Sequence, residues 1–140
     1  MSLSHYPGAW RIMMCDFNTG FKAPEIVKRR PVITISKRRR DNAQLCTVIP
    51  ISSTRPSVIR DYHYQIPTNV LPHYLRNNYS ESWVKADLIQ TVAFFRLTMF
   101  WHGRGNQGQR IYQTGAIDIE HQIEISNKLK CIFALKILES

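Results

Sequence analysis

The sequence predicts a small, mainly β domain that ends in one helix, and three observations support this fold class. Short apolar and β-branched runs alternate with turn residues over the first hundred positions. From residue 118 the apolar spacing becomes that of a helix. The 140 residues are 44% hydrophobic and 11% aromatic, which suits one core in a single domain covering 1–140. Because short strands leave sheet edges exposed, we expect a closed β-barrel capped by the helix.

Three strands are expected in the first half of the chain, each followed by turn residues. They cover residues 10–17, 32–36 and 45–51. Pro31 favours an extended conformation at Arg30 and cannot donate to a sheet, so this pair should mark the entry of the second strand. The apolar run L-C-T-V-I-P-I in the third strand predicts burial on both faces.

The second half is predicted to contain shorter strands before the helix. Strands are expected at 62–66 and at 84–92, the latter as one strand or two short ones. The intervening stretch should be irregular with one helical turn near 72–76, and the glycine-rich segment 103–108 should be a flexible loop. The helical face after residue 118 is formed by Ile125, Leu129, Ile132 and Phe133.

The positive charge is concentrated near the N-terminus. The net charge is +9, and residues 1–40 hold nine of the 19 Lys and Arg residues but only two of the ten acids. A concentrated positive face attracts polyanions, and nucleic acid is the commonest such partner for a small cytoplasmic protein. A membrane surface, or solubility alone, remains as an alternative.

The sequence shows no sign of a membrane span, a disulfide framework or a metal site. No apolar run approaches the roughly 18 to 20 residues that cross a bilayer, and residues 1–8 do not resemble a signal peptide, so we expect a cytoplasmic protein. Cys15, Cys46 and Cys131 are far apart among apolar neighbours, which predicts buried thiols. The five histidines lack metal-ligand spacing, so we expect neither a metal nor another cofactor.

The stretch K-R-R-P-V-I-T-I-S at 28–36 is the first candidate for chemistry, because three cations run directly into a strand. A strand would hold Arg30 rigidly, and its planar fork of donors suits a phosphate group. A solvated basic strand end is the plainer interpretation of the same residues.

Four further polar residues are candidates for the same site because expected strand ends bring them near Arg30. Glu25 precedes Arg30 by five residues, and Ser52 ends the third strand. Lys85 and Asp87, spaced i and i+2, should share one face of a strand. Two carboxylates, a hydroxyl and two cations suit general acid-base chemistry on a phosphodiester. Each also has a plainer explanation, as a charge partner, a strand terminator or a surface pair.

Several motifs, taken in order, resemble the PemK/MazF family of type II toxin-antitoxin toxins. They are P-G-A-W at 7–10, M-C-D-F at 14–17, E-x-x-x-x-R-P-V at 25–32, V-I-P-I-S-S at 48–53, K-A-D-L-I-Q-T-V at 85–92 and Arg96-Leu97. The resemblance implies an SH3-like barrel of the CcdB/PemK type with a C-terminal helix. It also implies a homodimer that cleaves single-stranded RNA without metal and is restrained by a cognate antitoxin protein.

The resemblance also assigns roles to individual residues. Arg30 matches the family's catalytic arginine, and Ser52 stands where a catalytic threonine is usual. Glu25 matches an acidic position beside the active site, and Asp87 matches the acid of one branch. The residues expected to bind RNA are Lys28, Arg29, Lys37, Arg38, Arg39, Arg40, Ser53 and Lys85.

The sequence departs from the family pattern at three places, and two other functions remain open. Pro24 replaces a histidine found in some members, Gln90 replaces a common arginine, and the connection 67–82 is longer than usual. One alternative is a CcdB-like barrel without catalysis that inhibits a protein such as DNA gyrase. The other is an RNA-binding barrel that does not cleave.

Overall fold

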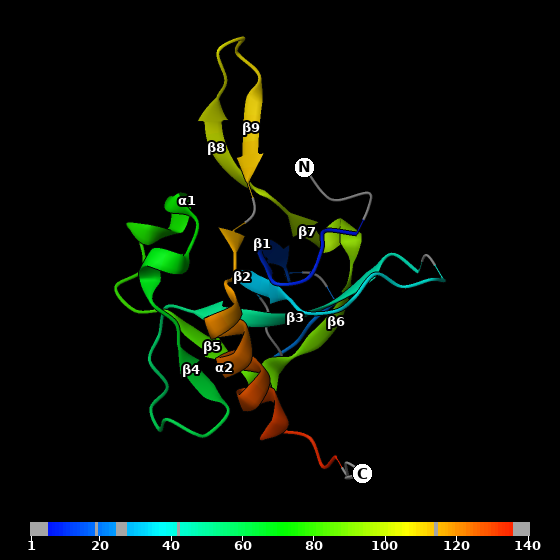
Figure 1. Cartoon of the computed structure of the whole chain (residues 1–140), viewed down its shortest axis with the longest axis vertical. Coiled ribbons are helices and arrows are strands. Elements are labelled where there is room, and N and C mark those ends of the chain that lie inside the picture. Colours follow the sequence, from blue (N-terminus) through cyan, green and yellow to red (C-terminus); the bar gives the residue numbers. More distant parts are fainter. Residues whose placement is uncertain (1–5, 19, 25–27, 42, 114, 136–140) are drawn as a thin grey trace.

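The computed structural model describes residues 6–18, 20–24, 28–41, 43–113 and 115–135, of which 101–104 and 110–113 are described by their backbone only. It contains ten strands and two α-helices within these ranges (Figure 1). The strands are β1 (Arg11–Asp16), β2 (Arg29–Thr34), β3 (Leu45–Ser52), β4 (His63–Gln65), β5 (Trp83–Lys85), β6 (Gln90–Ala93), β7 (Leu97–Thr98), β8 (Phe100–Arg104), β9 (Arg110–Gln113) and β10 (Gly115–Ala116). The helices are α1 (His73–Arg76), α2 (Ile119–Lys130) and the short 3₁₀ turns η1 (Thr68–Val70), η2 (Ala86–Leu88) and η3 (Phe94–Arg96).

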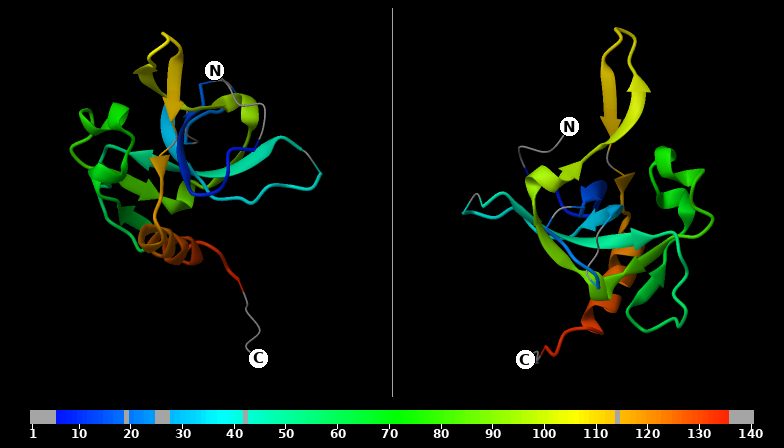
Figure 2. Two further views of the ribbon diagram at one scale, coloured as in Figure 1. Left: turned by 45° about the horizontal axis from the view of Figure 1, so that its top comes forward. Right: turned by 180° about the vertical axis from the view of Figure 1, so that it is seen from behind.

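Eight strands form one antiparallel sheet that bends back on itself. The order is β10-β1-β2-β3-β5-β4, with β6 paired to β3 and β7 paired to β1. Only η3 separates β6, which pairs with β3, from β7, which pairs with β1. These pairings therefore connect β3 back to β1, so that the strands form a small closed ring. The remaining strands, β8 and β9, form a hairpin that projects from the body (Figures 1 and 2).

Side chains of the central strands point alternately to two faces of the sheet, so the interior contains two hydrophobic cores. In β3, Cys46 and Val48 belong to a cluster inside the ring, whereas Ile49 and Ile51 belong to a cluster on the other face. Successive strand residues point to opposite faces, so a strand between two cores must be apolar on both. The predicted burial of this strand on both faces is confirmed.

The C-terminal helix covers the outer of these two cores but is shorter than predicted. Ile125 of α2 is fully buried in the cluster that contains Ile51. The helix ends at Lys130, so Ile132 and Phe133 lie beyond it, and Phe133 is exposed. The predicted helical face was therefore wrong at its last two positions, because periodicity alone does not mark where a helix frays.

Two other segment predictions also need correction. The second strand covers Arg29–Thr34 rather than 32–36, so Arg30 lies within the strand; β1 supplies the pairing partners for these residues. The glycine-rich segment 103–108 belongs to the β8–β9 hairpin, with Gly108 at positive φ in its turn. The stretch 84–92 does split into two strands, separated by η2.

The cysteines behave as predicted at two of three positions. Cys15 and Cys46 are buried free thiols inside the ring, and burial raises the pKa of Cys15 to about 12. Cys131 is exposed just after α2, which corrects the prediction for that residue. At neutral pH the two buried thiols are therefore protonated core residues.

The side chain of Thr34 forms hydrogen bonds that link the N-terminal segment to the sheet, and its loss should destabilise the fold. Its fully buried hydroxyl donates to the Gly8 carbonyl at 2.7 Å and accepts from the Arg11 amide at 3.0 Å. Thr34→Val keeps the shape but leaves both backbone groups unpaired, so we expect unfolding to become about 1 to 3 kcal/mol easier. Urea unfolding measures this, with exposed Thr91→Val as a control expected to change stability by less than about 0.5 kcal/mol. An equal loss in both variants would contradict the role given to Thr34.

Candidate functional site

Arg30 and Ser52 come from neighbouring strands and fall in the same cross-strand row. The register of β2 and β3 pairs Val32 with Pro50. Continuing it by two residues places Arg30 opposite Ser52, where side chains point to the same face of the sheet. The row extends to Trp83 of β5, which is the direct partner of Ser52. The sheet thus brings together the two residues that the sequence placed at the centre of the chemistry.

Both residues have surroundings that restrict their motion. Arg30 is half-buried, and its charge acts on Tyr79, although burial is the larger influence and raises the pKa of that phenol. Ser52 is buried at the end of β3. Its hydroxyl accepts from the Thr54 amide at 3.1 Å and lies 3.4 Å from the Thr54 carbonyl oxygen, so the turn after β3 fixes its position.

The structure places Lys85 and Asp87 in a neighbouring cluster, away from this row. Lys85 ends β5, and Asp87 is exposed in η2, so the two do not share a strand face as predicted. The chain turns into a 3₁₀ helix after Lys85, which breaks the two-residue alternation. Both charges act on His63, whose pKa is lowered chiefly by burial. Lys85 lies two positions past Trp83, about 7 Å along the strand from the row of Ser52.

Three other predicted residues are exposed next to Arg30 or Ser52 in the chain. Lys28 and Arg29 precede Arg30, with Arg29 pointing to the opposite face of β2, and Ser53 lies in the turn that follows Ser52. Glu25 lies outside the described residues. The candidate site that the structure describes is therefore built around Arg30 and Ser52, with cations at its margin.

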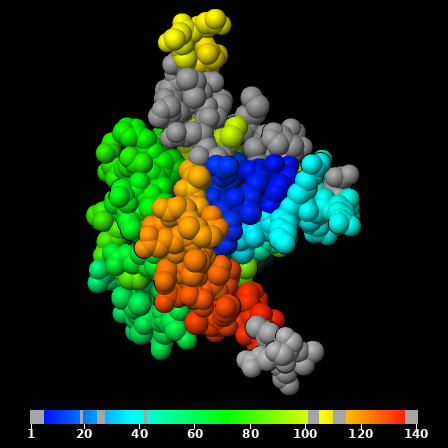
Figure 3. All heavy atoms as spheres, viewed as in Figure 1, coloured from blue at the N-terminus to red at the C-terminus, as the bar shows by residue number. Residues whose placement is uncertain are grey.

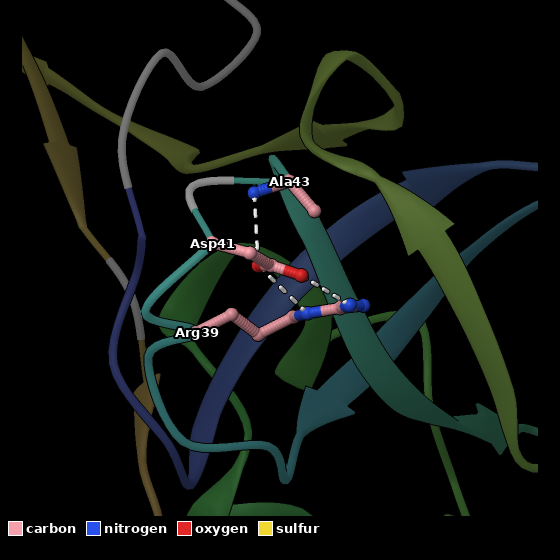
Figure 4. Close-up of polar contacts among 3 residues, drawn as sticks. All are labelled: Arg39, Asp41 and Ala43. Atoms are coloured by element: carbon pink, nitrogen blue, oxygen red, sulfur yellow. Dashed lines mark hydrogen bonds and ion pairs between the residues drawn. The ribbon is translucent and has the colours of Figure 1, made fainter.

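The predicted basic turn is the tip of a long arm between β2 and β3. The arm projects from the body in every view (Figures 1 to 3). Arg39 donates through Nε and Nη2 to the two carboxylate oxygens of Asp41 at 3.1 and 2.7 Å, and Asp41 also accepts from the Ala43 amide (Figure 4). Among the described residues, Lys37, Arg38 and Arg40 have no acidic partner. The arm therefore offers three unpaired cations and one that is paired.

Sequence reasoning missed an ion pair beside Ser52. Arg55 donates to Glu81 through Nε at 3.1 Å and Nη2 at 2.5 Å, and its guanidinium lies 5.6 Å from the centre of the Trp83 ring. Arg55 lowers the pKa of Glu81, so this carboxylate is ionised at neutral pH. The residues are 26 positions apart, which no local pattern reveals; the only signal was the position of Arg55, three residues after Ser52.

The three tyrosines Tyr64, Tyr74 and Tyr79, which precede or lie in the segment before β5, have different surroundings. The Tyr64 hydroxyl lies 2.7 Å from Nδ1 of His121 in α2, so it joins the helix to β4 on the face away from Ser52. Tyr74 is exposed on α1, and the partly buried Tyr79 packs against the core cluster that contains Ile51. Of these three tyrosines, Tyr79 is the one whose pKa is influenced by the charge of Arg30, although burial has the larger effect.

The described residues offer neither a metal site nor a membrane-spanning helix. No group of three or more His, Cys, Asp or Glu residues among them is arranged to hold a metal ion. No helix within the described ranges is long and apolar enough to cross a membrane.

Comparison with known proteins identifies the family. The model of the PemK-like, MazF-like toxins of type II toxin-antitoxin systems matches residues 9–133. The chain belongs to this family. Its relative YifN from Escherichia coli (strain K12), named as uncharacterized, is 27% identical over 140 residues, covering 88% of this chain and 93% of YifN. The resemblance seen in the sequence motifs is thereby confirmed.

Solved structures of this family share the fold. MazF from Deinococcus radiodurans aligns with a TM-score of 0.60 at 18% identity, covering 92% of this chain and 97% of that one. The Mycobacterium tuberculosis toxin MazF-mt6 aligns at 0.58 and 18% identity, covering 91% and 99%. A mycobacterial endoribonuclease in complex with its cognate antitoxin aligns at 0.58 and 16% identity, covering 95% and 100%. The predicted mainly β fold with a C-terminal helix is confirmed.

Proposed function

We propose that this chain is an endoribonuclease that cleaves single-stranded RNA without a metal ion. The observation that carries the proposal is the register of β2 and β3, whose continuation places Arg30 opposite Ser52, where β2 begins and β3 ends. Membership of the PemK-like, MazF-like family and the similar folds of proteins titled endoribonuclease support it. A guanidinium and a hydroxyl held on adjacent strands suit a phosphate whose charge changes during reaction.

The proposed reaction is an internal transesterification. The 2′-oxygen attacks the adjacent phosphorus, the bond from phosphorus to the 5′-oxygen breaks, and the products are a cyclic phosphate and a free 5′-hydroxyl. Arg30 stabilises the charge that accumulates on the phosphoryl oxygens, and Ser52 donates a hydrogen bond to them. The high pKa of arginine makes it a weak proton donor near neutrality, so its role is electrostatic.

A carboxylate is proposed to accept the 2′-proton, and the sequence offers Glu25 and Asp87 for this role. Asp87 lies in the cluster with His63, and Glu25 lies outside the described residues. The leaving 5′-oxygen takes a proton from water. Comparing the pH–rate profiles of Glu25→Gln and Asp87→Asn assigns the general base. Only loss of the true base should remove the fall in cleavage rate at low pH.

The proposal extends to substrate binding and partners. Lys37 to Arg40 on the arm, with Lys28, Arg29, Ser53 and Lys85, bind flanking parts of the RNA in a salt-dependent way. Two chains pair so that the RNA track crosses both subunits, because one domain offers only a short basic track. The proposed partner is a cognate antitoxin protein, and the proposed compartment is the cytoplasm. Solved structures with similar folds include a mycobacterial endoribonuclease in complex with its cognate antitoxin and MazE-MazF from Deinococcus radiodurans.

Incubation of the pure protein with a long RNA in excess EDTA tests the function. We expect discrete fragments with cyclic phosphate ends, because the proposed groups at the reacting phosphate are a guanidinium and a hydroxyl. RNA binding without fragments would favour a barrel that binds but does not cleave. Absence of both would favour a protein target. Cleavage that stops in EDTA and returns with a divalent ion would contradict the metal-free mechanism.

A further inference from the structure

An open groove of about 410 Å³ lies beside the candidate site, between the end of β4 and the segment before β5. Polar side chains line both of its walls. They are Gln65, Thr68 and Asn69 on one side and Ser80, Glu81 and Ser82 on the other. Its volume lies within the roughly 300 to 1,000 Å³ of small-molecule sites. Amides, hydroxyls and a carboxylate are the groups that read the edges of unpaired bases.

The walls of the groove are joined by hydrogen bonds, so its shape is set before any ligand arrives. The Ile66 amide donates to the Ser82 carbonyl at 3.0 Å, and the buried Ser82 hydroxyl donates to the Ile66 carbonyl at 2.5 Å. These bonds hold the segment before β5 against the end of β4. A preformed groove loses less freedom on binding than a mobile loop.

The register of the sheet places this groove near the reacting phosphate. Trp83 is paired with Ser52 on one side and with Gln65 on the other, so these three residues form one row. Strands lie about 4.8 Å apart, which puts Gln65 about 10 Å from Ser52 on the same face. A nucleotide adjacent to the scissile phosphate can reach that far with its base.

Glu81 gives the groove a defined chemical preference. Both donors of Arg55 contact Oε1 of Glu81, and Oε2 accepts no hydrogen bond from any residue the structure describes. The buried indole N–H of Trp83 makes no hydrogen bond of good geometry to these residues, but its interaction with the carboxylate is one cause of the lowered pKa of Glu81, after the larger effect of Arg55. The groove therefore presents an ionised oxygen that can only accept.

We propose, building on the proposed RNA cleavage, that this groove binds a base next to the scissile phosphate and selects guanine through Glu81. Guanine presents two adjacent donors, N1–H and the 2-amino group, on its Watson–Crick edge. Adenine and cytosine place a ring acceptor beside their amino group, and uracil places its N–H between two carbonyls. The free Oε2 of Glu81 meets a lone pair beside the donor at those three bases, and it meets two adjacent donors only at guanine.

Single-turnover cleavage of short RNAs tests this specificity. The RNAs differ only in the two bases on each side of a cleavage site mapped beforehand, with guanine also replaced by inosine, which lacks the 2-amino group. We expect guanine to be preferred about tenfold or more at one position, with inosine intermediate. Glu81→Gln should reduce this preference to within about threefold, because an amide both donates and accepts. Glu81→Asp, which keeps the carboxylate, should retain part of it.

Glu120→Gln is the matched control, since it makes the same change at an exposed position of α2 and should leave base preference unchanged. Thermal unfolding shows that each variant is folded. No guanine preference at any flanking position, or a preference that survives Glu81→Gln, would overturn the inference. Binding of uncleavable 2′-O-methyl RNAs tests the base preference independently of the proposed cleavage. Guanine-selective binding that is lost in Glu81→Gln would support guanine selection by the groove even if the protein cleaves no RNA.

Discussion

Replacing Arg30 by alanine should slow single-turnover RNA cleavage by about a hundred- to a thousandfold while leaving RNA binding nearly unchanged. One preorganised donor aimed at developing charge has an effect of about this size, and it acts mainly in the transition state. Arg30 is held within β2 by its pairing opposite Cys15 and is half-buried. The measurement is the cleavage rate at saturating RNA, compared with equilibrium binding of an uncleavable RNA.

Two further substitutions make this test specific. Arg30→Lys keeps the charge but loses the planar fork, so we expect it to be nearly as slow as the alanine variant. Arg29→Ala removes the adjacent, exposed cation, which points to the opposite face of β2. It should weaken binding a few-fold and leave the rate at saturation unchanged. Cleavage by Arg30→Ala at close to the parent rate would remove Arg30 from the centre of the mechanism.

Neutralising two cations of the arm should weaken RNA binding and leave the cleavage rate at saturating RNA unchanged, the reverse of the effect of Arg30→Ala. In the double variant Arg38→Ala/Arg40→Ala we expect RNA affinity to fall roughly tenfold or more at moderate salt, with the rate at saturation unchanged. Each lost phosphate contact should reduce the salt slope of binding by about 0.7 for a single strand. Such contacts act equally in the ground and transition states, so they change affinity and not the chemical step.

The Arg39–Asp41 pair supplies the internal control for the arm. Arg39 already donates two hydrogen bonds to Asp41, so Arg39→Ala should weaken binding less than either neighbouring substitution. Asp41→Asn should tighten binding by no more than about fivefold, because exposed ion pairs are weak. Titrations over a range of salt concentrations measure both. Equal losses for all three arginines would show that only net charge matters.

The strands with the strongest patterns could be predicted from sequence because their side chains carry the signal. The apolar run of β3 indicated burial on both faces, and β-branched and apolar runs indicated strands close to the observed β1 and β2. The short elements were less predictable. η2 interrupts the segment that contains Lys85 and Asp87, and β8 and β9 pair across a glycine-rich turn, because tertiary contacts override weak local preference there.

The residues of the candidate site also differ in whether the sequence alone could reveal them. Arg30 and Ser52 could be named from sequence because a cation beside Pro31 and a hydroxyl after an apolar run are local features. The ion pair of Arg55 with Glu81 could not be named, since the two residues are 26 positions apart and meet only because β3 and β5 are neighbours. The placement of Asp87 beside His63 likewise depends on the pairing of β4 with β5.

The sequence by itself indicated the class of fold and the basic character of the arm, and it offered Arg30 and Ser52 as candidates for the site. These depend on composition, alternation and short motifs, which are properties of neighbouring residues. Only the tertiary structure decided which side chains share a row, because register is set by packing between strands that are distant in the chain. It therefore decided that Trp83, Gln65 and Glu81 extend the surface next to Ser52, and that Tyr64 faces α2 instead.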